Sequence, residues 1–201
     1  MSVSLLVDPP ALEEGVRDAY SAAAARPMDA HGFPVGRSFA LDVGYPEDLL
    51  DLLPAASVEA FAGVSDVSMR AQLPRGATVL DLGCGAGLDT LVAAQRVGGA
   101  GRVHAVDFSD EMLQRAREAA MEARLDNIAF HRTPGRALPL DDASVDVAMV
   151  NGIFNLNPDR DALFDELARV VKPRGRVYAS ELVLVEPLEE RDVCSLKEWF
   201  A

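Results

Sequence analysis

Short apolar runs alternate with helical patterns through the carboxyl-terminal two thirds of the chain. The runs are rich in β-branched residues, which is typical of buried parallel strands, and the segments between them repeat apolar positions at helical spacing. Strands that alternate with helices predict a doubly wound α/β fold, with a mostly parallel sheet covered on both faces. We expect strands at residues 78–81, 103–107, 127–132, 145–150 and 176–185, and helices at residues 88–97, from 110 on, and 159–171.

The chain before this region is helical and rich in turns. A helical pattern begins at Pro9 and stops before Arg26, because the residue that precedes a proline leaves the helical region. Glycines and prolines break residues 28–45 into an expected ordered loop with short helical turns, and residues 46–53 and 65–72 predict short helices. The sequence therefore predicts two parts of one compact unit, a helical cover (1–75) and a ligand-binding domain (76–201), which ends in an acidic, helix-like tail (186–201).

A glycine-rich turn follows the first expected strand. The segment reads Asp81-Leu82-Gly83-Cys84-Gly85-Ala86-Gly87 and leads directly into a helical pattern. Glycines permit positive φ and a close approach of a ligand to the backbone, and the free N–H groups of the next helix face the same point. The dinucleotide fingerprint needs a further glycine where this chain has Leu88, so nicotinamide binding is disfavoured.

A second acid, Asp107, ends the next expected strand, twenty residues after Gly87. The carboxyl ends of neighbouring parallel strands share one crevice, so Asp107 can accept hydrogen bonds from the two hydroxyls of a ribose above the glycine turn. Together the turn and the acid predict a nucleoside site. A Rossmann-like domain for some other nucleotide is the alternative.

This order of acid, glycines and second acid resembles the S-adenosylmethionine-dependent methyltransferases of class I. The resemblance implies S-adenosylmethionine as cofactor, with the turn around its methionine part and Asp107 on its ribose. It also implies that the amino-terminal extension packs over the carboxyl end of the sheet and shapes an acceptor pocket. Class I domains add an antiparallel hairpin after the fifth strand, and this chain has no room for one, so we expect an abbreviated fold or a truncated chain. The expected cofactor contacts are Asp81, Gly83, Cys84, Gly85, Gly87, Asp107, Phe108, Met112, Gly135, Arg136 and Asn151.

Two segments are similar to the arsenite methyltransferase branch, the stretch from Gly44 to Val64 and the stretch from Asn151 to Asp159. Members of that branch bind trivalent arsenic through cysteine thiolates, which are soft ligands for a soft centre. Here Gly152 stands where one such cysteine is expected, a second is missing near Val64, and a third would lie near or beyond Ala201. Cys84 lies within the cofactor turn and Cys194 matches no ligand position, so the chain lacks this arsenic-binding set.

The segment after the third strand also departs from the family pattern, because Pro134 stands where many class I enzymes place an acid for the adenine. We expect adenine contacts from the backbone of Gly135 or Arg136, or else a plain tight turn. Asn151, after the fourth strand, is interpreted as positioning cofactor or acceptor, with a turn-forming role before Gly152 as the alternative.

No catalytic base is assigned. His31, Tyr20, Tyr45 and Glu181 are candidates, but each is explained as well by packing or hydrogen bonding. An acceptor with an available lone pair needs only alignment with the methyl group, whereas a phenol or hydroxyl needs a base.

Amino-acid composition limits the classes of partner and the cellular compartment that we expect. The chain has 32 acidic against 19 basic residues and a net charge of −13, so we expect neither nucleic acid nor an anionic membrane as partner. Two cysteines far apart in sequence indicate no disulfide framework or metal cluster, and with no export or anchor signal they predict a cytoplasmic protein.

The sequence thus predicts methyl transfer to a small, uncharged or cationic acceptor. The alternatives are an arsenite-type enzyme with altered ligands, a noncatalytic S-adenosylmethionine-binding module, and a homo-oligomer that pairs at an open sheet edge.

Overall fold

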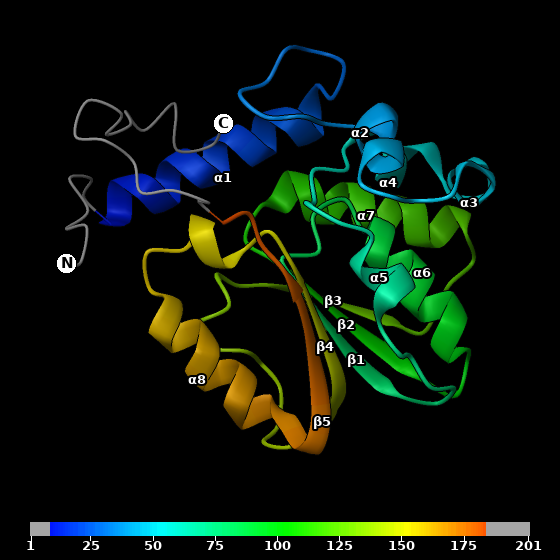
Figure 1. Cartoon of the computed structure of the whole chain (residues 1–201), viewed down its shortest axis with the longest axis vertical. Coiled ribbons are helices and arrows are strands. Elements are labelled where there is room, and N and C mark those ends of the chain that lie inside the picture. Colours follow the sequence, from blue (N-terminus) through cyan, green and yellow to red (C-terminus); the bar gives the residue numbers. More distant parts are fainter. Residues whose placement is uncertain (1–8, 184–201) are drawn as a thin grey trace.

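The structure is a computed structural model that describes residues 9–183. Its centre is a five-stranded sheet in the order β3-β2-β1-β4-β5, and every neighbouring pair is parallel (Figure 1). This confirms the predicted α/β class. The strands are β1 (Thr78–Leu82), β2 (Arg102–Asp107), β3 (Ile128–Arg132), β4 (Val145–Asn151) and β5 (Val171–Ser180).

Helices cover both faces of the sheet. Alternate residues of β1 and β4 pack against α6 (Leu88–Val97) and α5 (Val67–Arg70), while α7 (Asp110–Glu122) packs beside them over β2. The intervening residues, among them Leu80 and Ala148, pack against α8 (Arg160–Val170) on the opposite face. Because side chains alternate along a strand, the continuous apolar runs of β1 and β4 fill both layers.

The amino-terminal extension folds into α1 (Pro9–Ala25), α2 (Arg37–Asp42), α3 (Glu47–Leu52), α4 (Ala55–Glu59) and α5. Figure 1 shows α1 as a separate helix across the end of the sheet towards which the strand arrows point. Hydrogen bonds attach it to α7, where Ser21 Oγ lies 2.9 Å from Ser109 Oγ and Arg115 donates to the carbonyl of Ala24. The extension shares a core cluster with α6 and α7, in which Tyr45, Leu50 and Phe61 pack with Leu88 and Leu91.

The fifth strand differs from its prediction, which placed a turn at residues 173–175 and began the strand at residue 176. In the structure β5 already begins at Val171, opposite Val145, and the register shifts before Arg176 pairs with Val147. Arg174 has φ +73° within this irregular part. The residues with turn character therefore form an irregular stretch within the strand, since pairing with β4 continues on both sides of it. The predicted tail, residues 186–201, lies outside the described residues.

The connection between β3 and β4, residues 133–144, contains no helix. His104 pairs in register with Leu80, so it lies on the α8 side of the sheet at the edge made by β2 and β3. His131 lies beside it, with its Nε2 atom 3.0 Å from His104 Nδ1. This edge of the face is less covered than the centre, and both rings are partly exposed.

Candidate functional site

The glycine turn joins β1 to α6 in a conformation that only glycine adopts easily. Gly83, Gly85 and Gly87 have φ of +77°, +52° and +88°. A Cβ atom at Gly83 would meet Ile153 Cδ1 at 2.1 Å, and one at Gly87 would meet Ala116 Cβ at 2.9 Å. The turn therefore packs against its neighbours through backbone, and it leaves the amino-terminal N–H groups of α6 beside the carboxyl ends of the strands.

Asp107 ties the second strand to this turn. Its Oδ2 atom accepts from the N–H of Gly85 and its Oδ1 atom from the N–H of Ser109, both at 2.9 Å. The side chain is 7% exposed, and burial raises its pKa while the backbone N–H groups act in the opposite direction. Each carboxylate oxygen keeps a second lone pair, so the group can also accept from a pair of ligand hydroxyls.

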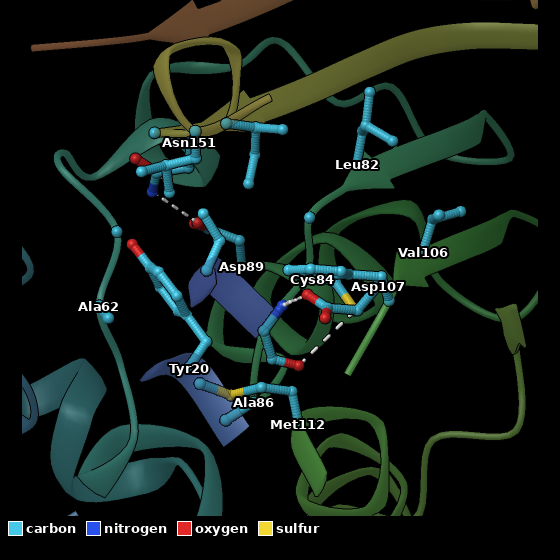
Figure 2. A pocket seen from close by; sticks show the side chains of 18 of the residues that line it. Tyr20, Ala62, Leu82, Cys84, Ala86, Asp89, Val106, Asp107, Met112 and Asn151 are labelled. Atoms are coloured by element: carbon cyan, nitrogen blue, oxygen red, sulfur yellow. Dashed lines mark hydrogen bonds between the residues drawn. The ribbon is translucent and has the colours of Figure 1, made fainter. Parts of the chain in front are cut away.

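A pocket of about 1000 Å³, counting open solvent at its mouth, opens above the turn (Figure 2). Its floor is the glycine turn with the ends of β1 and β2, and one wall is a face of α1 that carries Glu13, Val16 and Tyr20. The other walls are residues 57–63, residues 133–134 and residues 151–158. Most of the lining is apolar, which is usual for small-molecule sites. The remaining side chains on these walls include Phe61, Ala62, Leu82, Val106, Phe108, Met112, Ile153, Leu156 and Pro158.

The charges that line the pocket are all negative. They belong to Glu13, Asp89 and Asp107, and no lysine, arginine or histidine lies on the walls formed by the described residues. Glu13 is itself held by Arg136, whose Nη2 atom lies 2.8 Å from Glu13 Oε2. This pair connects α1 to the loop after β3.

Asp81, behind the turn, and Asp89, on the pocket wall, are both buried carboxylates. Asp81 is 2% exposed and accepts from the hydroxyl of Thr90, and burial together with the nearby charge of Asp89 raises its pKa to about 8. Asp89, in the first turn of α6, accepts from the Tyr45 hydroxyl, from Ser68 N–H at 3.1 Å and from Asn151 Nδ2 at 3.0 Å. Burial raises the pKa of Asp89 as well, and these hydrogen bonds oppose the shift.

The sequence profile of a family described as a methyltransferase domain matches residues 73–200. The chain belongs to this methyltransferase domain family. Among curated relatives, the arsenite methyltransferase of Halobacterium salinarum is 34% identical over 197 residues, which cover 91% of this chain and 50% of that protein. The demethylmenaquinone methyltransferase of Lactococcus lactis is 37% identical over 106 residues, which cover 53% of this chain and 42% of that protein. The chain thus matches half or less of the length of these relatives.

Solved structures agree with this family. A SAM-dependent methyltransferase from Aquifex aeolicus superimposes with a TM-score of 0.55 at 26% identity, over 75% of this chain and 81% of that one. An arsenic(III) S-adenosylmethionine methyltransferase from Chlamydomonas reinhardtii gives a TM-score of 0.52 at 28% identity, over 74% and 49% of the two chains.

Most of the predicted contact residues line the pocket of this methyltransferase domain: Gly83, Cys84, Gly85, Gly87, Asp107, Phe108, Met112 and Asn151. Asp81 lies behind the turn instead. In the segment after β3 the lining residues are Thr133 and Pro134, while Gly135 packs towards Leu163 and Leu82 and Arg136 binds Glu13. Whether these residues bind a cofactor stays a prediction.

The candidate bases separate clearly. Tyr20 reaches into the pocket from α1 (Figure 2), and burial raises the pKa of its hydroxyl, with Asp107 and Glu181 adding to the shift. Tyr45 is buried against Asp89, His31 lies 2.9 Å from the carbonyl oxygen of Arg26, and Glu181 accepts from the N–H of Phe154 at 2.6 Å. Of these four, Tyr20 is the one on the pocket wall.

Sequence reasoning missed Asp89 as a site feature. The resemblance did imply that the extension packs over the carboxyl end of the sheet, and α1 lines the pocket there with Glu13, Val16 and Tyr20, which share one helix face. The contacts that hold α1 in this place join it to α7, far away in sequence, and no local pattern predicts them.

The pocket fits the cofactor of the family. Gly85 offers open space, since a Cβ there would have only Met112 Sδ within 4 Å, at 3.9 Å. Asp107 provides acceptors for a diol, and Leu82, Val106 and Phe108 provide apolar surface beside it. An adenosine portion is therefore matched in both its polar and its apolar parts.

Proposed function

We propose that this methyltransferase domain binds S-adenosylmethionine and transfers its methyl group to a small-molecule acceptor. The observation that carries the proposal is the joint geometry of the glycine turn and Asp107, whose carboxylate accepts from Gly85 N–H at the floor of the pocket. The family membership and the named activities of the relatives support the same reaction.

When bound, the cofactor supplies an electrophilic methyl group on a positively charged sulfur. The chain would hold its ribose at Asp107 and its methionine part along the turn at Gly83–Gly87. The wall made by residues 57–63 and the α1 face at Val16 and Tyr20 would then place an acceptor and exclude water. Because burial raises the pKa of Tyr20, its hydroxyl would stay protonated and act as a hydrogen-bond donor rather than as a base.

Arsenite methylation with altered ligands is the second candidate, since the Halobacterium relative carries that name. Cys84 argues against it, because its side chain packs with Ala105 and Leu113 and burial raises the pKa of its thiol, which keeps the sulfur protonated. Cys194 lies outside the described residues. Because Cys84 is the single cysteine among the described residues, these residues supply no pair of thiolates for arsenic, and we propose an organic acceptor. If no acceptor is methylated, the alternative is a noncatalytic module that binds S-adenosylmethionine.

The test is a calorimetric titration with S-adenosylmethionine and S-adenosylhomocysteine. We expect saturable binding to the wild type and a loss of about 10- to 100-fold in affinity for Asp107→Ala, because two buried hydrogen bonds to a charged group are removed. Asp110→Ala is the matched control, since this nearby acid is 65% exposed and forms a surface ion pair with Arg132. A folded wild type that binds neither ligand would overturn the proposal.

We further propose that the chain works as one compact unit in a reducing cytoplasm. Its free Cys84 supports that setting. No described helix combines the length and apolar character that a membrane crossing requires. Pairing of two copies along a sheet edge stays a prediction, and the mass in solution would decide it.

A further inference from the structure

Asn151, at the end of β4, uses its whole side chain within the protein. Its Oδ1 atom accepts from the N–H groups of Val64 at 2.8 Å and Ser65 at 3.1 Å. Its Nδ2 atom donates to the carbonyl of Ser65 at 2.8 Å and to Asp89 Oδ2 at 3.0 Å. An amide offers two donors and two acceptor lone pairs, so all four positions are occupied.

The segment that Asn151 holds, residues 61–65, packs closely on the turn after β4. A Cβ atom at Gly63 would lie 2.5 Å from Asn151 Nδ2, and one at Gly152 would lie 3.2 Å from Val64 Cγ1. Ser65 Oγ also donates to Ser180 Oγ at 2.7 Å. Since Phe61, Ala62 and Gly63 line the pocket, this segment is a pocket wall that Asn151 holds in position.

The fourth hydrogen bond of Asn151 connects this wall to the helix that follows the glycine turn. Asp89 belongs to the first turn of α6 and is anchored by the Tyr45 hydroxyl and Ser68 N–H. The dashed line between Asn151 and Asp89 in Figure 2 marks the connection. The Asn151 side chain thus connects the end of β4 both to α6 and to the 61–65 wall.

We infer that Asn151 is a positioning residue, which sets the 61–65 wall against the acceptor instead of contacting cofactor or acceptor itself. This inference rests on the proposed function for what the wall faces. It assigns acceptor selection to the wall residues and replaces the sequence-based interpretation of Asn151 as a ligand contact.

The first test compares Asn151→Ala with Asp107→Ala. Hydrogen exchange of the Val64 and Ser65 amides should become at least about tenfold faster in Asn151→Ala, because their acceptor is removed, while amides of β1 keep their wild-type rates. Affinity for S-adenosylhomocysteine should stay within about threefold of wild type, in contrast to the larger loss in Asp107→Ala.

A second variant perturbs the 61–65 wall without changing the Asn151 side chain. Gly63→Ala puts a Cβ against Asn151 Nδ2, and we expect the same local rise in exchange at Val64 and Ser65. When Gly63→Ala is combined with Asn151→Ala, the new Cβ no longer meets the amide. Gly63→Ala should therefore change the unfolding equilibrium by a smaller factor in the Asn151→Ala background than in the wild type. The Gly63→Ala arm decides the question if Asn151→Ala does not fold.

The inference is overturned if Asn151→Ala loses ligand affinity as strongly as Asp107→Ala, because Asn151 then touches the ligand. It is also overturned if exchange at Val64 and Ser65 is unchanged, or rises equally throughout β1, which would indicate general destabilisation. Failure of the wild type to bind S-adenosylhomocysteine would sink the proposed function, and the exchange and double-variant results would still decide whether Asn151 holds the wall.

Discussion

At the scale of single residues, the site contains three buried carboxylates that make different contacts. Asp107 faces the pocket, Asp89 holds Tyr45 and Asn151, and Asp81 lies behind the turn against Thr90. Asp81 and Asp107 were recognisable in the sequence because each follows an apolar run. Asp89 was not, since an acid in the first turn of a helix is commonly explained by the helix dipole.

Asp81 gives a prediction about pH. Its pKa in the folded chain is raised to about 8 from 3.8, so the folded state binds more protons than the unfolded state between these values. The contribution of Asp81 to the free energy of unfolding of the ligand-free protein should therefore fall as pH rises from about 4 to 8.

We expect Asp81→Asn to reduce this decline by an amount on the order of 4 kcal/mol between pH 5 and pH 8.5. Urea unfolding at the two pH values measures it. Equal declines in wild type and variant would show that Asp81 ionises normally in the fold.

At the scale of elements, the connection after β3 contains no helix, and the edge of the sheet formed by β2 and β3 is partly exposed. His104 and His131 stack with ring centroids 5.3 Å apart, on the side of the sheet that α8 covers over β1 and β4. Burial lowers the pKa of His104 to about 4, and the positive charges of His131 and Arg102 add to the effect. The histidine pair is therefore neutral at pH 7 and resists protonation.

Because the pKa of His104 is lower in the folded state than in the unfolded state, its contribution to the free energy of unfolding decreases as pH falls from about 6.5 towards about 4. We predict that His104→Gln removes part of this loss, on the order of 1 kcal/mol after allowance for solvent screening, because the ring is partly exposed. Thermal unfolding at pH 7 and pH 4.5 measures it, with His31→Gln, a partly exposed histidine outside the sheet, as the control. A slope in His104→Gln as steep as that of the wild type would contradict the assignment.

At the scale of the whole molecule, the amino-terminal extension and the sheet share one core. Tyr45, Leu50 and Phe61 from the extension pack with Leu88 and Leu91 of α6. Removal of the extension would expose these apolar surfaces to water. We therefore expect the parts of the chain before and after residue 75 to fold as one unit.

We predict that the chain unfolds in one cooperative transition, and that a fragment of residues 76–201 fails to fold alone. Circular dichroism in the far ultraviolet and the near ultraviolet, which report helices and tyrosine packing, should give coincident denaturation curves. Two separated transitions, or a monomeric fragment with a cooperative transition of its own, would show independent domains.

Sequence reasoning went furthest where function depends on local spacing. The strands, the glycine turn and Asp107 follow from patterns within about thirty residues, because one βαβ unit fixes them. The irregular start of β5 and the partners of Asn151 depend on pairings between distant segments. Asn151 bonds to residues more than eighty positions away, so its amide could be assigned to a ligand or a turn but not to Val64 and Ser65.

The way in which Asn151 holds the 61–65 wall has a consequence for how such a site can change over time. All of its bonds to that segment go to backbone N–H and C=O groups, which every amino acid except proline provides. A residue such as Ala62 can therefore be exchanged for a larger or more polar one while the anchorage stays intact. The scaffold can in this way pass to new acceptors by single substitutions, without rebuilding the part that binds the methyl donor.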